Sequence, residues 1–144
     1  MRIGIDARML GSGFGIGRFI EHLVLDLRQI DRDNTYILFL KKGGISESEI
    51  HSADYRLLIA DIEHVITDIP WYSWEEQIKF KSIIKKANID IMHFPHWNVP
   101  LLYNDPFVVT IHDLIMFHYP RPEATTLGPL KVWAKDKAHR LVIR

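Results

Sequence analysis

The fold is decided by residues 1–30, which read MRIGIDARMLGSGFGIGRFIEHLVLDLRQI. The short apolar segment Ile3–Ile5 is typical of a buried strand, and the glycines from Gly11 to Gly17 predict a loop soon after it. From Arg18 onward, apolar side chains recur at the spacing of one face of an α-helix; they are Phe19, Ile20, Leu23, Val24, Leu27 and Ile30. The opening stretch therefore predicts a strand, a glycine loop and an amphipathic helix in that order.

Further apolar segments predict that the strands continue along the chain. Tyr36–Leu40 is expected to be a second buried strand, so that strand, helix and strand form a right-handed parallel crossover. Other strands are expected at Tyr55–Ala60, His64–Ile69, Ile89–Phe94 and Phe107–Ile111.

Two more helices are predicted between and after these strands. The first begins after Tyr72, because Ser73 and Glu76 have the spacing of a capping box. Its predicted buried side consists of Trp74, Ile78, Ile83, Ile84 and Ala87. A last helix is expected over Leu127–Arg140, where Pro129 is tolerated in the first turn.

Strands that are apolar along their whole length and alternate with helices favour a parallel sheet covered on both faces. We therefore predict an α/β fold with a doubly wound, mainly parallel, Rossmann-like sheet, and we interpret residues 1–144 as one such domain. Leu141–Arg144 is typical of the start of a further strand, so we expect the chain to be truncated. In such sheets ligands bind beyond the carboxyl ends of the strands, here after Ile5, Met92 and Ile111.

The composition excludes several classes of protein. With 144 residues, 47% of them hydrophobic, the chain is long enough for one domain with its own core. It has no cysteine, which excludes disulfide, thiol and iron–sulfur chemistry. The 18 basic and 18 acidic side chains balance, so the charge does not favour nucleic acid as a partner. The sequence shows no secretory apolar core and no membrane-spanning run, and we expect a cytoplasmic protein.

The glycine loop is the first candidate for ligand binding. A strand-to-helix turn of small residues lets a phosphate approach the backbone amides at the positive end of the helix. The loop does not follow the dinucleotide fingerprint, whose third glycine falls on Ile16, Arg18 or Ile20, and it lacks the Gly-Lys-Ser/Thr of a Walker A loop. Two interpretations stay open: a general anion-binding turn, or a flexible loop whose glycines only permit close packing.

Histidines gather near the ends of the later predicted strands. Of the eight histidines, four lie there: His93, His96, His112 and His118. A zinc site built on His93 and His96 lacks a helical frame and a Cys/His partner set, so no metal is expected. His112 and Asp113 place an imidazole and a carboxylate where an apolar strand meets the predicted crevice. The alternative for His112 is a hydrogen-bonded structural histidine.

Aromatic side chains are also common in the turn-rich stretches of the chain. They are Trp71, Tyr72, Trp74 and Trp97. Such rings suit stacking on a sugar or another flat apolar face, and packing in the core is the alternative.

Five short motifs occur in order along nearly the whole chain. They are MRIGIDAR (Met1–Arg8), GIGRF (Gly15–Phe19), YSWEEQ (Tyr72–Gln77), HFP (His93–Pro95) and VTIHDL (Val109–Leu114). Together they resemble the N-terminal half of glycosyltransferase family 4, the retaining GT-B enzymes, and especially its mannosyltransferase-like members. The resemblance implies two Rossmann-like domains that face a cleft. This chain matches the N-terminal, mainly acceptor-binding domain.

The resemblance also implies roles for individual residues. Gly15, Gly17 and Arg18 are expected to approach the diphosphate of the donor across the cleft. His112 is expected to be the active-site histidine near the transferred sugar, with Asp113 beside it as a second catalytic candidate. Apart from these carried-over roles, we expect Tyr72, Trp74, His96 and Trp97 to contact the acceptor. The Glu-x7-Glu signature of the family belongs to the C-terminal donor-binding domain, which is absent from this chain.

The implied activity of the full-length enzyme is hexosyl transfer with retention, with GDP-mannose as the expected donor and no cofactor or required metal. The expected partners are this nucleotide-sugar and a saccharide or lipid-linked acceptor. The lysines Lys79, Lys81, Lys85 and Lys86 indicate either a solvated helix face or peripheral contact with an anionic membrane.

We expect the isolated chain to be inactive and its exposed cleft face to favour self-association. Two other function classes stay open. One is a free-standing nucleotide- or anion-binding Rossmann-like module. The other is a nicotinamide-dependent oxidoreductase, which the failed glycine fingerprint weakens.

Overall fold

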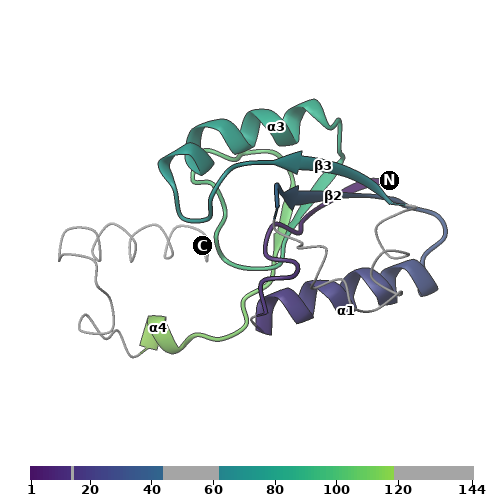
Figure 1. Ribbon diagram of the computed structural model, residues 1–144, viewed down its shortest axis with the longest axis horizontal. Coiled ribbons are helices and arrows are strands. Elements are labelled where there is room, and N and C mark those ends of the chain that lie inside the picture. Colours follow the sequence, from purple (N-terminus) through teal and green to yellow (C-terminus); the bar gives the residue numbers. More distant parts are fainter. Residues whose placement is uncertain (14, 44–61, 119–144) are drawn as a thin grey trace.

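The computed structural model describes residues 1–13, 15–43 and 62–118, and these residues form one five-stranded sheet (Figure 1). The strands are β1 (Arg2–Asp6), β2 (Thr35–Lys41), β3 (Glu63–Thr67), β4 (Ile91–Phe94) and β5 (Phe107–Val109). Their order across the sheet is β3-β2-β1-β4-β5, and every neighbouring pair is parallel. The predicted mixed α/β architecture with a parallel sheet is confirmed.

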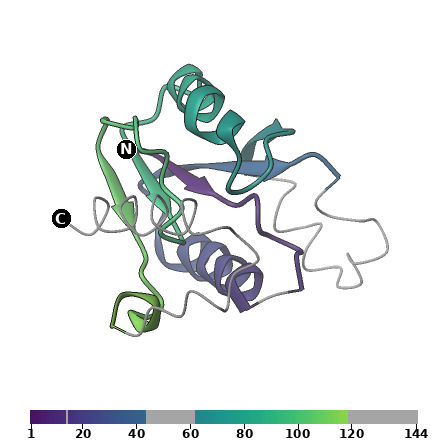
Figure 2. The same cartoon turned by 90° about the vertical axis from the view of Figure 1, so that its left-hand side faces the viewer.

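Helices cover both faces of this sheet (Figure 2). Helix α1 (Gly15–Ile30) lies on one face, and the helical segment 74–86 lies on the other. That segment contains five π-helical residues, η1 (Glu76–Phe80), followed by α3 (Lys81–Lys86). A short helix, α4 (Ile115–His118), follows β5.

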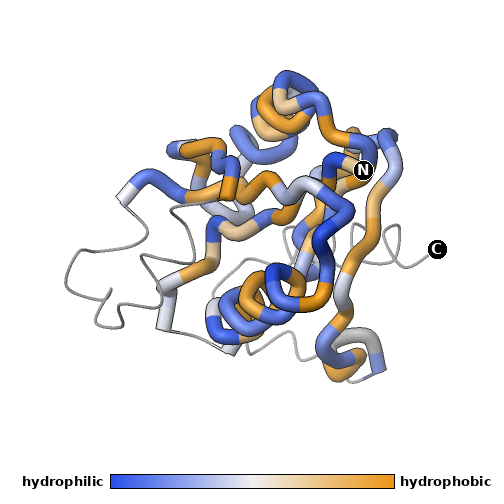
Figure 3. The backbone as a smooth tube through the Cα atoms, turned by 90° about the vertical axis from the view of Figure 1, so that its right-hand side faces the viewer, coloured by the Kyte–Doolittle hydropathy of each residue, from blue (hydrophilic) through white to orange (hydrophobic). Residues whose placement is uncertain are grey.

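Alternation along β2 divides the core into two clusters. Leu38 and Leu40 pack with Ile20 and Val24 of α1. On the other face, Ile37 and Phe39 pack with residues that include Phe80, Ile84, Met92 and Phe94. Because both faces of the strand are covered, its centre is apolar throughout, as parallel sheets require. Figure 3 shows hydrophobic and hydrophilic residues alternating along both long helices, as expected when one side of each helix faces the sheet.

Gly4 lets the central strand approach its neighbours on the face of α3. A Cβ at this position would lie 2.6 Å from Ile89 Cδ1, 2.8 Å from Met92 Sδ and 3.0 Å from Phe39 Cε2. All three distances are shorter than ordinary van der Waals contact, so a side chain here would require the surrounding core to move.

Most of the expected elements that fall within the described residues are confirmed with small shifts of their ends. The strand predicted over His64–Ile69 is β3 and ends at Thr67. The strand predicted over Phe107–Ile111 is β5 and ends at Val109. The predictions for Tyr55–Ala60, Leu127–Arg140 and Leu141–Arg144 lie outside the described residues.

The predicted buried side of the second helix is wrong at two positions. Trp74 is 85% exposed and Ile78 is 68% exposed, whereas Glu76, Phe80 and Ile84 are buried. Residues two positions apart in a helix point to nearly opposite sides, so burial of Glu76 and Phe80 turns Trp74 and Ile78 toward solvent.

The capping box at this helix is half formed. The Glu76 backbone N–H donates to Ser73 Oγ at 3.1 Å, as predicted. The Glu76 carboxylate, however, accepts from the backbone N–H of Tyr72 at 2.9 Å and also contacts Arg8 and Asn98. The Glu76 carboxylate therefore pairs with the buried Arg8 instead of accepting from the backbone N–H of Ser73, which would complete the capping box.

Candidate functional site

The order of the sheet places a candidate site at the carboxyl ends of its strands. The chain order reverses between β1 and β4, which lie side by side, and ligands of open α/β sheets bind at such a point. The arrows of β2 and β3 in Figure 1 point toward the side on which α1 begins and α4 lies. The start of α1 and the segments after β4 and β5 therefore share one edge.

The two glycines at the start of α1 have different surroundings. A Cβ on Gly17 would lie 2.8 Å from the Met9 carbonyl oxygen and 2.9 Å from Ser12 Oγ, so this glycine lets the loop pack on the helix. Around Gly15, by contrast, no atom of the described residues outside its chain neighbours and its own helix backbone lies within 4 Å of the corresponding position. Close packing explains Gly17, whereas Gly15 leaves open space beside the first amides of the helix.

Charge at the start of α1 is positive. The first turn contains no acidic residue, and the side chain of Arg18 is exposed there. A cation at the positive end of a helix dipole is unfavourable for the isolated protein. The same arrangement attracts an anion, because the first backbone amides of the helix and the Arg18 guanidinium both carry positive charge.

A buried ionic network of Asp6, Arg8, Glu76 and Asn98 lies at the same edge of the sheet, after β1. Arg8 donates from Nε and Nη2 to the two carboxylate oxygens of Asp6, at 2.8 and 2.7 Å. It also contacts the carboxylate of Glu76, and its guanidinium carbon lies 3.9 Å from the centre of the Phe80 ring. Asn98 Nδ2 donates to both oxygens of Glu76, at 2.7 and 2.8 Å. These contacts connect the end of β1 to the second helix and to the loop after β4.

Burial shifts the protonation of this network. Loss of water raises the pKa of the Glu76 carboxyl above its ordinary value, and the charge of Asp6 adds to the rise although Arg8 and Asn98 oppose it. Burial acts to lower the pKa of Arg8, but hydrogen bonding and attraction to Asp6, together with Glu76, outweigh that effect and raise it. Arg8 therefore remains a fixed buried cation.

Glu76 also holds Tyr72, which in turn contacts His96. Tyr72 has a left-handed backbone, with φ of 56°, and its N–H donates to Glu76 Oε2 at 2.9 Å. Its hydroxyl lies 2.7 Å from His96 Nε2, and the Trp97 backbone N–H donates to His96 Nδ1 at 3.0 Å. Since Nδ1 accepts, the neutral imidazole carries its proton on Nε2 and donates to Tyr72. Burial and Glu76 raise the pKa of Tyr72 to about 12, so its hydroxyl stays protonated.

His112 lies beside this group. Its Nε2 is 2.8 Å from the Pro95 carbonyl oxygen, which can only accept, so the neutral ring carries its proton there and Nδ1 is an acceptor. The ring makes an edge contact with Phe19 of α1 at 4.9 Å and lies 6.3 Å from the ring of His96. His112 thus joins the start of α1 to the segment after β4.

Asp113, the second catalytic candidate, has a local structural contact. Its Oδ1 accepts from the backbone N–H of Ile115 at 2.9 Å, which caps the start of α4. The other oxygen of this exposed carboxylate has no partner among the described residues.

His93 lies within β4, and its side chain is less exposed than that of His112. Its Nε2 lies 2.8 Å from Thr110 Oγ1, and burial lowers the pKa of His93 below its ordinary value. Within the described ranges, no group of three or more His, Cys, Asp or Glu side chains could hold a metal ion.

Of the residues predicted for the acceptor, the structure brings Tyr72, His96 and Trp97 together with His112. Trp74 is not part of this cluster, since no contact in the described portion of the chain connects it and its side chain is exposed. The prediction from the sequence missed Arg8 and Asn98. The spacing of Asp6 and Arg8 at a strand end was a usable signal, because such a pair can close a bidentate contact.

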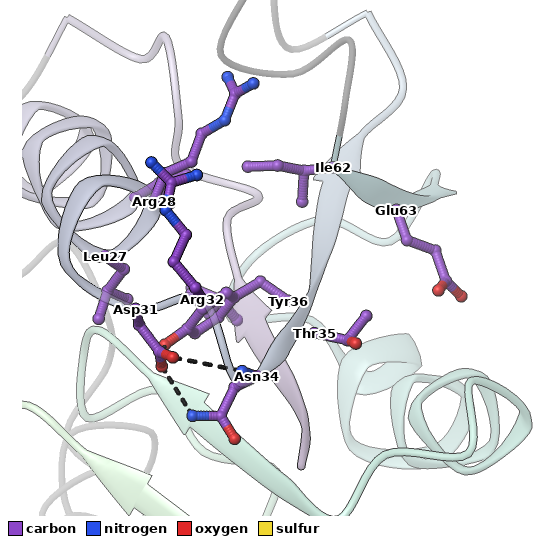
Figure 4. Close-up of a pocket in the computed structure, with 11 residues that line it drawn as sticks. Leu27, Arg28, Asp31, Arg32, Asn34, Thr35, Tyr36, Ile62 and Glu63 are labelled. Atoms are coloured by element: carbon purple, nitrogen blue, oxygen red, sulfur yellow. Dashed lines mark hydrogen bonds between the residues drawn. The ribbon is translucent and has the colours of Figure 1, made fainter.

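A cavity of about 290 Å³ lies at the opposite, amino edge of the sheet (Figure 4). The side chains of Arg28 and Arg32 rise along one wall, while Asp31 on the same wall bonds to Asn34 Nδ2 at 2.7 Å. The Asp31 carboxylate also accepts from the hydroxyl of Tyr36 at 2.5 Å, and these bonds lower its pKa. The hydrogen bonds of Asp31 in this cavity thus stabilise the turn between α1 and β2.

Comparison with protein-family models, with curated proteins and with solved structures gave no match for this chain. Among the helices described, none is long and apolar enough to cross a membrane. Functional inference therefore rests on the residues of the carboxyl edge.

Proposed function

We propose that this chain is the acceptor-side domain of a retaining GT-B glycosyltransferase that moves a hexose, with mannose from GDP-mannose as the favoured case. One observation supports the proposal above the others. The open start of α1 at Gly15 and the imidazole of His112 lie on one edge of a parallel sheet, joined by the contact of His112 with Phe19. A diphosphate and the sugar attached to it require an anion site and a polar side chain next to each other.

The donor diphosphate would lie against the first amides of α1. Gly15 leaves space for a phosphate to approach, and Arg18 adds positive charge. As the bond to the leaving diphosphate breaks, negative charge grows on the phosphate oxygens, and fixed amide dipoles stabilise it without reorganisation. The remaining contacts to the nucleotide would come from a second domain.

His112 would bind the transferred sugar. With its proton on Nε2 held by the Pro95 carbonyl, Nδ1 accepts a hydrogen bond from a sugar hydroxyl and fixes the ring during transfer. The acceptor would lie against Tyr72, His96 and Trp97, whose rings meet at this edge. Aromatic faces stack on the apolar faces of sugars, and the His96 ring is held by the Tyr72 hydroxyl and by the backbone N–H of Trp97.

Calorimetric binding of GDP and of GDP-mannose to the wild-type chain and to His112→Ala tests this proposal. We expect His112→Ala to weaken GDP-mannose about two- to tenfold, the value of one hydrogen bond, and to leave GDP unchanged. His64→Ala is the matched control, because His64 is exposed on β3 and its hydrogen bond within the described residues is a local one to the Ile62 carbonyl. Equal weakening of both ligands, or none, contradicts a sugar contact by His112.

A free-standing nucleotide- or anion-binding module is the second candidate function, and the open, positively charged start of α1 favours it as well. Such a module recognises phosphate and not the sugar. It predicts equal affinities for GDP and GDP-mannose, together with loss of both on Arg18→Gln.

A further inference from the structure

Near the carboxyl ends of β2 and β3, two buried polar atoms have no hydrogen-bond partner among the described residues. Thr67 is 4% exposed, and within the described residues its hydroxyl makes no hydrogen bond. The indole N–H of Trp71, four residues further along, is likewise buried and unpaired. Buried polar side-chain atoms are satisfied in the large majority of cases, so two such atoms close in the chain need a reason.

Lys41 joins these two residues. It is the register partner of Thr67 in the parallel pair of β2 and β3, and directly paired residues point to the same face of a sheet. Its ammonium lies 4.9 Å from the centre of the Trp71 ring. Lys41 therefore lies beside Thr67 in the sheet and beside the ring of Trp71, so the three residues are neighbours at the carboxyl ends of β2 and β3.

The chemistry of this group is that of hydrogen-bond donation. The ammonium and the indole N–H can only donate, and the hydroxyl is able to donate. The carboxylate of Asp6, which lines a small cavity with Trp71 and His96, is already paired with Arg8 through two bonds of 2.8 and 2.7 Å. A ligand with acceptor oxygens and negative charge complements what remains.

We propose that Lys41, Thr67 and Trp71 form a subsite for an oxyanion, a phosphate or carboxylate group. The subsite lies at the carboxyl ends of β2 and β3, and its residues are separate from those at the start of α1. Trp71 and His96 line one small cavity, and the His96 ring lies 6.3 Å from the ring of His112. The assignment of this subsite to the sugar acceptor rests on the proposed function. If the acceptor occupies the subsite, the acceptor carries an anionic group. The subsite itself does not require transfer.

Titration of the chain with inorganic phosphate at constant ionic strength tests this subsite, with the indole ¹H–¹⁵N signal of Trp71 as the readout. We expect that signal to shift. Lys41→Met should weaken phosphate about tenfold or more, as loss of one charge-assisted contact does. Lys42→Met is the matched control, because it removes the same charge from the neighbouring exposed side chain and should leave affinity within twofold of the wild type.

Thr67→Val provides a second test that does not depend on charge. Since the hydroxyl has no partner in the described structure, its removal should leave the thermal midpoint unchanged or raised, yet weaken phosphate binding. Tighter binding of a short isoprenyl phosphate through the same residues would assign the anion to a lipid-linked ligand, and equal binding would assign it to a free phosphate group. An unmoved Trp71 signal, or equal affinities of Lys41→Met and Lys42→Met, overturns the subsite regardless of the result with GDP-mannose.

Discussion

Replacing Glu76 by glutamine is expected to destabilise the fold strongly, although the two side chains have nearly the same shape. The Glu76 carboxylate is 0% exposed. It accepts hydrogen bonds from three groups that can only donate to it: the Arg8 guanidinium, the Asn98 side-chain amide and the backbone N–H of Tyr72. Glutamine offers one acceptor oxygen and one donor group, so at least one buried donor must face another donor. Arg8 also loses one of its two carboxylate partners.

The cost can be worked from the structure. Breaking a buried ion pair costs about 3–5 kcal/mol, and the lower end applies because Arg8 keeps its bidentate contact with Asp6. For a domain of this size, about 3 kcal/mol corresponds to a fall in Tm of roughly 6–12 °C. The matched control is Glu75→Gln, which removes only an exposed pair with Lys79 and should cost less than about 1 kcal/mol.

The assay is thermal unfolding followed by circular dichroism at neutral pH, supported by urea unfolding. Arg8→Met should be at least as destabilising as Glu76→Gln, because it leaves the carboxylates of Asp6 and Glu76 together without a cation. If Glu76→Gln melts within about 2 °C of the wild type, the network does not stabilise the carboxyl edge and the reasoning is refuted.

Three further predictions concern other parts of the described structure. Gly17→Ala should cost about 1–3 kcal/mol, because its Cβ would meet the Met9 carbonyl, whereas Gly15→Ala should change stability by less than about 1 kcal/mol; urea unfolding of both variants compares them. Burial lowers the pKa of His93, so the folded state disfavours the protonated ring. The contribution of neutral His93 to stability is complete above the unfolded pKa of 6.5 and is lost as the pH falls below that value. Tm should therefore fall more between pH 7 and pH 5 for the wild type than for His93→Asn, and parallel curves would exclude this role. Trp74→Ser should change the free energy of unfolding by less than about 0.5 kcal/mol because the side chain is exposed, and a larger loss would mean that Trp74 packs against the core.

Local pattern in the sequence was enough to predict the centre of the sheet and its first helix. β1, α1 and β2 follow from apolar segments whose periodicity depends on neighbours along the chain, and both periodicities are confirmed. The same reasoning failed for Trp74 and Ile78. There the buried side of the helix is set by Glu76, whose partner Arg8 lies 68 residues earlier in the chain, and periodicity carries no information on such a pair.

The placement of the candidate residues at one edge of the sheet was predictable to a similar extent. Because carboxyl ends of parallel strands share an edge, residues after β4 and β5 were expected near the start of α1, and the contact of His112 with Phe19 agrees with that. The different surroundings of Gly15 and Gly17 depend on how the loop folds back, which the glycine pattern does not specify. The unpaired atoms of Thr67 and Trp71 become visible only once the structure gives the partners of every buried polar group.

Residue-resolved NMR titration of the 144-residue chain with GDP-mannose tests the central claim most directly. The proposed donor site predicts that the backbone amides at Gly15 and Gly17 and the ring signals of His112 shift together and saturate with one affinity. GDP should reproduce the shifts at the amides and not those at His112. Unmoved signals at all three residues, or shifts confined to the cavity around Arg28 and Arg32, would contradict the claim that this edge receives a nucleotide-sugar.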